Sequence, residues 1–131
     1  MSSSYADDCF TRAINALQAA ELLSDAFPDD AASRACYGAF HAVSAAFACA
    51  GRTFRKHSAV RAAVHRDLVA AGDWDAARGE AYDFLWSLRD TGDYGGGRHV
   101  TSEEADKAVE AAREIIEAVM SLRPELSRDS A

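Results

Sequence analysis

The spacing of apolar residues is the feature that most limits what this chain can fold into. In its last third they recur in steps of four and three, at Ala105, Val109, Ala112, Ile116 and Val119. Such spacing puts them on one side of an α-helix, and no segment alternates apolar and polar residues as a half-buried β-strand does. Proline occurs only twice in 131 residues. The sequence therefore predicts an all-α protein without a sheet.

Five helical segments follow from this spacing and from the capping residues. The expected ranges are from Ser2, Ser3 or Ser4 to about residue 27, then about 30–50, 56–71, 73–89 and 101–122. Thr101 with Glu104 three residues later is a capping box, and Gly51 stands where a left-handed C-cap favours glycine. Amphipathic helices joined by short loops predict a four- to five-helix up-and-down bundle.

The length of the chain fits one domain, residues 1–131. We expect its core to cover about residues 5–123 and its polar end, 124–131, to be frayed. The second segment carries small residues on more than one side, among them Ala42, Ala45, Ala46 and Ala48. Close packing within one chain explains them, and so does a homodimer, which we expect.

The charge balance excludes one class of function and leaves another open. Fourteen Lys and Arg residues face 21 Asp and Glu residues, a net charge of −7. A wholly basic protein that coats nucleic acid is thereby excluded, whereas a local basic patch is not. Residues 52–66 contain five cations and no acid: Arg52, Arg55, Lys56, Arg61 and Arg66. This segment is either solvated helix surface or a contact for RNA, a nucleotide or an acidic protein.

The sequence lacks the residues that several kinds of metal, disulfide and membrane site require. The three cysteines are too few and too widely spaced for a disulfide framework or a zinc site. No glutamate has a histidine three residues later, the pair that di-metal bundles use. The first residues do not resemble a signal peptide, and no apolar run could cross a bilayer. We expect a cytoplasmic protein with no metal, no cofactor and no membrane contact.

Two groups of polar residues are candidates for a binding site. Arg34, Tyr37 and His41 are three and then four residues apart, so one helix face carries all three. Arginine, tyrosine and histidine together can hold a phosphate and move a proton, although a half-buried polar seam would use the same spacing. The second group is Arg89, Asp93 and Tyr94, which would also suit an ion pair that closes a helix.

Four segments resemble small prokaryotic HEPN proteins. Residues 33–42 are similar to the second-helix signature of that family, 56–60 to the start of its third helix, 88–94 to the end of its fourth and 100–105 to the start of its last. The resemblance covers about residues 6–122. It implies a HEPN-like all-α bundle that usually dimerises. It also implies frequent association with a small nucleotidyltransferase, often as a toxin–antitoxin or stress-response pair.

Many HEPN proteins are metal-independent ribonucleases, and their motif is an arginine, four to six residues and a histidine. The arginine would bind the scissile phosphate, and the histidine would transfer a proton from the ribose 2′-hydroxyl. Here Arg89 is followed by Asp93 and Tyr94 with no histidine in that window, and nine residues separate Arg89 from His99. The chain matches a branch of the family that has Arg and Asp-Tyr at this place.

Three functions are consistent with these residues. The preferred one is a HEPN-type binding module for a nucleotide, RNA or a partner nucleotidyltransferase, with both polar groups converging in one groove that a twin subunit completes. The alternative is a metal-independent endoribonuclease with a non-standard motif. Its catalytic candidates are Arg89, Asp93, His41 and His99, where His41 or His99 would replace the missing histidine. The third is a structural or regulatory helical dimer without a ligand.

Overall fold

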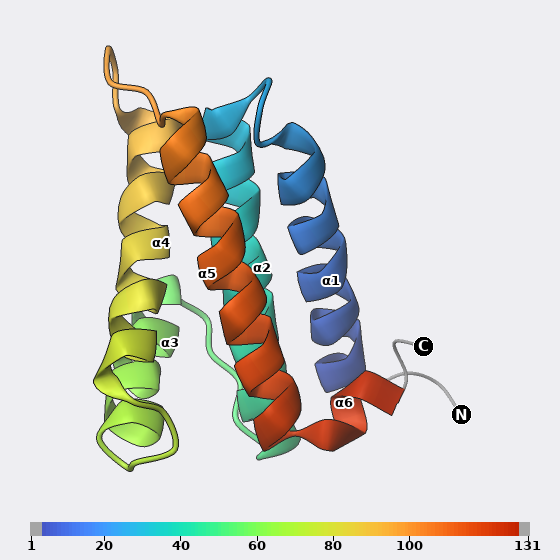
Figure 1. Ribbon diagram of the computed structural model, residues 1–131. Helices are drawn as coiled ribbons and strands as arrows, with labels where there is room; N and C mark the ends of the chain where they lie inside the picture. Colours follow the sequence, from blue (N-terminus) through green and yellow to red (C-terminus); the bar gives the residue numbers. More distant parts are fainter. Residues whose placement is uncertain (1–3, 129–131) are drawn as a thin grey trace.

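The computed structural model describes residues 4–128, which form helices joined by short loops and contain no strand (Figure 1). The helices are α1 (Tyr5–Leu23), α2 (Pro28–Cys49), α3 (His57–Ala63), α4 (Ala76–Tyr94), α5 (Ser102–Leu122) and α6 (Pro124–Arg128), and a π-helical turn, η1 (Val64–Val69), continues α3. The prediction of an all-α bundle is confirmed.

α2 is the central helix and packs against α1, α4 and α5 (Figure 1). Most of its buried residues are alanine, with Gly38 among them. Small side chains let neighbouring helices approach closely, so the small residues on several sides of α2 are used within one chain. The homodimer stays a prediction.

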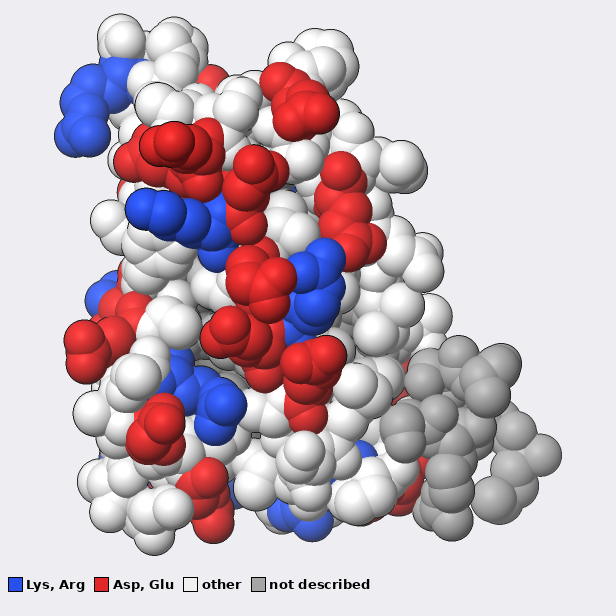
Figure 2. Space-filling view, viewed as in Figure 1, with Lys and Arg blue, Asp and Glu red and all other residues white. Residues whose placement is uncertain are grey.

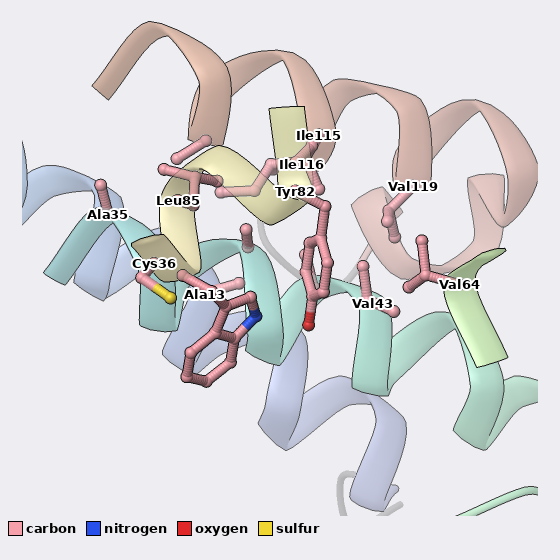
Figure 3. Packing of buried hydrophobic residues seen from close by; sticks show 14 of the residues in the cluster. Ala13, Ala35, Cys36, Val43, Val64, Tyr82, Leu85, Ile115, Ile116 and Val119 are labelled. Carbon is pink, nitrogen blue, oxygen red and sulfur yellow. The ribbon is translucent and has the colours of Figure 1, made fainter. Parts of the chain in front are cut away.

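The core lies where α4 and α5 meet over α2. Figure 3 shows Tyr82 and Leu85 of α4 beside Ile115 and Ile116 of α5, with Val43 of α2 beneath them. All five side chains are at most 2% exposed. This continuous apolar contact holds α2, α4 and α5 in fixed positions relative to one another, and with them the polar faces of α2 and α4.

The capping residues act as the sequence predicts. Ser4 caps α1 with Asp7, and Thr101 caps α5 with Glu104, each as a reciprocal capping box; Ser2 and Ser3 lie outside the described residues. Gly51 follows α2 with a φ of +77°, a backbone conformation that favours glycine.

Two helices differ from their expected course because of tertiary packing. α4 continues to Tyr94, well past residue 89, and its Gly92 lies against the α2 backbone: a Cβ there would stand 2.8 Å from the carbonyl oxygen of Asp29. The third helix changes to a π turn at Val64, where a Cβ on Gly79 of α4 would meet Val69 Cγ2 at 2.9 Å. Close contact with another helix, which spacing along the chain does not reveal, shapes both places.

The ends also differ. α1 stops at Leu23, four residues before the expected end, and α2 begins at Pro28, where proline suits the first helical turn. The expected frayed tail forms a helix over Pro124–Arg128, because Leu126 is buried against the bundle; residues 129–131 lie outside the described part. No described helix is long and apolar enough to cross a membrane.

Candidate functional site

The polar face predicted on α2 lines a groove between α2 and α1. Its volume is about 430 Å³. Arg34, Tyr37 and His41 form the α2 side, and Arg12, Asn15, Ala16 and Ala19 form the α1 side. Alanines on α1 leave the space open, while the longer polar side chains surround it. We call this surface the α1/α2 groove.

The α1 side of the groove was missed by sequence reasoning, although a pattern for it exists. Arg12, Asn15 and Ala19 have the same three- and four-residue spacing as Arg34, Tyr37 and His41. Spacing alone did not show that the two faces are opposed, since that depends on how α1 packs against α2.

The α1/α2 groove is cationic on an acidic protein. Among the described residues that line it, none is a carboxylate. Arg12 and Arg34 are both exposed, and within residues 4–128 neither forms an ion pair. By contrast, Figure 2 shows Asp and Glu side chains spread over the face on which α5 lies. The groove therefore offers two free guanidinium groups, the kind of donor that binds phosphate.

His41 stays neutral in this setting. Burial lowers the pKa of its imidazole below the usual 6.5, and the nearby charges of Arg12 and His57 lower it further. A neutral imidazole has one donor and one acceptor nitrogen. His41 can therefore accept a proton from a ligand or donate a hydrogen bond to it.

Tyr37 connects the groove to the second predicted group. Its ring packs edge-on against Trp86 of α4 at 6.1 Å and against His57 at 5.9 Å between centroids. Its hydroxyl accepts a hydrogen bond of 2.9 Å from Nη2 of Arg89. Trp86 and His57, which sequence reasoning did not single out, thus hold the ring that lines the groove.

Arg89 has acidic partners within the chain, although its buried Nε makes no hydrogen bond among the described residues. Its Nε faces Asp93 Oδ2 at 3.0 Å in ion-pair geometry, and Nη1 donates to Asp90 Oδ1 at 3.3 Å. The guanidinium also lies 5.3 to 5.6 Å from the ring centroids of Tyr37, Trp86 and Tyr94. The side chain is only 16% exposed. The two predicted groups therefore meet at Tyr37, and we call Arg89 with its carboxylate and tyrosine partners the Arg89 clamp.

His99 lies apart from the groove. Its Nδ1 pairs with Asp29 Oδ2 at 2.7 Å, and the next residue, Val100, donates its backbone N–H to Asp29 Oδ1 at 2.7 Å. These bonds fix the loop between α4 and α5, residues 95–101, to the start of α2. Of the two histidines considered as replacements for the missing motif histidine, only His41 lines the groove.

Three of the five cations in the predicted basic segment, residues 52–66, are paired with acids. Asp67 pairs with Arg52 at 2.8 Å and with Arg66 at 3.0 Å, and Asp83 of α4 pairs with Arg61 at 2.7 Å. Hydrogen bonds from Arg66 and Arg52 lower the pKa of Asp67 to about 2. The segment itself contains no acid, but these two residues outside it supply the countercharge. Only Arg55 and Lys56 lack an ion pair within the described residues.

Other places on the molecule fit a ligand less well. A larger groove of about 540 Å³ lies where α1 begins and α6 packs, and its described lining has carboxylates, Asp7 and Glu125, but no cation. No group of three or more potential metal ligands occurs among residues 4–128. The α1/α2 groove is therefore the best candidate site.

Two comparisons with known proteins agree with the resemblance. The family model described as HEPN domain matches residues 6–122. A UPF0332 protein of Thermotoga maritima is 33% identical over 98 residues, which cover 75% of this chain and 74% of that protein.

Proposed function

Because the chain belongs to the HEPN family, we propose that it is a binding module whose α1/α2 groove holds the phosphates of a nucleotide or an RNA. One observation carries this proposal. Arg12 and Arg34 are exposed and unpaired in a groove whose described lining has no carboxylate, on a chain with a net charge of −7. An anion that enters this groove gains charge-assisted hydrogen bonds without displacing an existing ion pair.

The other groove residues suit the same ligand. Asn15 and Tyr37 supply neutral hydrogen-bonding groups, and Ala16 and Ala19 leave room for the ligand. The HEPN family is often nucleotide- or RNA-related, and its domains commonly dimerise. A homodimer, a nucleotidyltransferase partner, a toxin–antitoxin or stress-response role and a cytoplasmic location belong to this proposal as expectations.

Ribonuclease activity is the second candidate, and His41 is the observation in its favour. A neutral imidazole beside two arginines could take the proton of a ribose 2′-hydroxyl while the arginines bind the adjacent phosphate. The positions where the family motif would have its histidine, residues 94–96, hold Tyr94 and two glycines. Binding is therefore the primary proposal, and cleavage is an outcome to test.

The test is titration of a fluorescently labelled oligouridylate by anisotropy, in EDTA. We expect the double variant Arg12→Gln, Arg34→Gln to lose about tenfold or more in affinity, since hydrogen bonds to charged groups contribute about 1.5–3 kcal/mol each. Lys107→Gln is the matched control, because it removes one exposed charge from α5, which does not line the groove. Equal affinity of all three proteins would contradict the proposal. Cleavage in EDTA that His41→Ala abolishes would establish the ribonuclease.

A further inference from the structure

We propose that Arg89 does not touch the bound phosphate but is a positioning residue, which turns the Tyr37 hydroxyl into a hydrogen-bond donor aimed at the groove. This inference rests on the proposed function, since it assigns a role within the same site. It departs from the role that the family motif would give to this arginine.

The guanidinium of Arg89 is already occupied by partners within the chain. Three of its nitrogens already face Tyr37, Asp93 and Asp90, and its side chain is 16% exposed. Arg34, in contrast, is exposed and has no ion pair within the described residues. A phosphate next to Arg89 would also meet two carboxylates. Repulsion by like charges makes that position unfavourable for an anion.

The second step concerns the direction of the hydrogen bond to Tyr37. A guanidinium has donors only, whereas a tyrosine hydroxyl has one donor and can also accept. In the 2.9 Å contact Arg89 therefore donates, and Tyr37 accepts. The hydroxyl proton is left over, and no other hydrogen bond of this hydroxyl occurs among residues 4–128. Tyr37 lines the groove, and in the proposed role that proton is donated to a phosphate oxygen bound there.

The third step concerns how firmly Tyr37 is held. Its ring meets the rings of Phe40, His57 and Trp86 at 5.9 to 6.3 Å between centroids, at nearly perpendicular angles. These contacts fix the position of the ring. The hydrogen bond from Arg89 makes the hydroxyl oxygen an acceptor and leaves its proton for donation. Asp93 Oδ2 in turn lies 3.0 Å from the Nε of Arg89 as its ion-pair partner. Without Arg89, no described hydrogen bond would orient the hydroxyl proton toward the groove.

The experiment measures how the affinity for the labelled oligouridylate depends on salt, because each lost phosphate contact lowers the slope of log affinity against log salt by about 1. We expect Arg34→Gln to show that change. Arg89→Gln should weaken binding about two- to tenfold, the effect of one neutral hydrogen bond, with an unchanged slope. Tyr37→Phe, which keeps the ring, should do the same.

The double variant Arg89→Gln, Tyr37→Phe completes the cycle and should bind no worse than either single variant. If Arg89→Gln does not fold in a thermal melt, Arg89→Lys takes its place in the cycle. A slope lowered by about 1 in Arg89→Gln, or losses that add in the double variant, would overturn the positioning role. Failure of the wild type to bind, or no effect of Arg34→Gln, would instead remove the proposed function and this inference with it.

Discussion

The α1/α2 groove and the basic segment, residues 52–66, carry the same kind of side chain and differ in what surrounds it. Arg12 and Arg34 have no ion pair within the described residues, whereas Asp67 alone pairs with two arginines of the basic segment. Both arginines of the groove are therefore unpaired, whereas in the basic segment only Arg55 and Lys56 lack an ion pair within the described residues. Whether an arginine is free to bind an external anion therefore depends on the acids that lie near it in space. The sequence does not show directly which acids those are.

The physical reason lies in the helices that face each region. The basic segment packs against α4, whose Asp83 reaches Arg61 and His65. The α2 side of the groove faces the part of α1 that presents Arg12, Asn15 and two alanines, and the acids of α1 lie elsewhere. Four predictions test whether this difference in pairing is the cause.

Charge reversal in the groove should have the largest effect. We expect Arg34→Glu to lower oligouridylate affinity by about a hundredfold or more, because it removes a charge-assisted hydrogen bond and adds repulsion. Arg66→Glu makes the same change in net charge in the basic segment and should have little effect. Anisotropy titrations at one salt concentration compare them. Similar losses in both variants would end the distinction between the two regions.

Filling the groove should come next in size. Ala19→Leu adds apolar bulk to the lining without changing any charge, and we expect about a tenfold loss of affinity, close to 1.4 kcal/mol. Ala62→Leu, at an exposed position of the basic segment, is the matched control. An unchanged affinity in Ala19→Leu would show that the ligand binds outside the groove.

Acidification should strengthen binding a few-fold, and only through the groove. Burial, Arg12 and His57 hold the pKa of His41 below 6.5, so His41 is neutral near pH 7 and becomes charged as the pH falls through that lowered value. A bound phosphate favours the charged form, so affinity rises as the pH decreases from 7. For the free protein the sign is opposite, because His41 costs stability as the pH falls below 6.5. Titrations at several pH values measure this dependence, and in the variant His41→Gln we expect the affinity to stop rising as the pH decreases.

Removing the countercharge of the basic segment should have the smallest effect. Asp67→Asn frees Arg52 and Arg66, and we expect about a twofold gain in oligouridylate affinity at low salt that disappears at physiological salt. Asp83→Asn, which frees Arg61, should behave alike. A gain that persists at high salt would mean that the freed arginines form a specific site, and the comparison would need to include them.

The sequence predicted most of the fold, because helix periodicity and capping are local properties. The capping boxes at Ser4 and Thr101 and the left-handed Gly51 are where their patterns place them. The errors occur where a distant contact decides the backbone. α4 runs on to Tyr94 in contact with Asp29, and the last helix forms because Leu126 finds a buried position.

Only one side of the candidate site could be predicted from the sequence, because only that side depends on local spacing. The face with Arg34, Tyr37 and His41 follows from spacing along one helix. The opposing Arg12 depends on the pairing of α1 with α2, and the countercharge at Asp67 depends on side-chain geometry. That Arg89 is an internal partner of Tyr37 needed three-dimensional contacts between residues 52 positions apart.

The π-helical turn at Val64–Val69 has a consequence for how relatives of this chain can vary in length. Its wide loop is closed by the bond from the Ala70 N–H to the His65 carbonyl, five residues back, so it holds one residue more than an α-turn. Deleting that residue would restore a plain α-helix and rotate whatever follows by about 100°. A homologue with a one-residue gap here would keep the helix, but its counterpart of Asp67 would point away from the counterpart of Arg52. In such a homologue the segment equivalent to residues 52–66 would lack the counterpart of the Arg52–Asp67 ion pair.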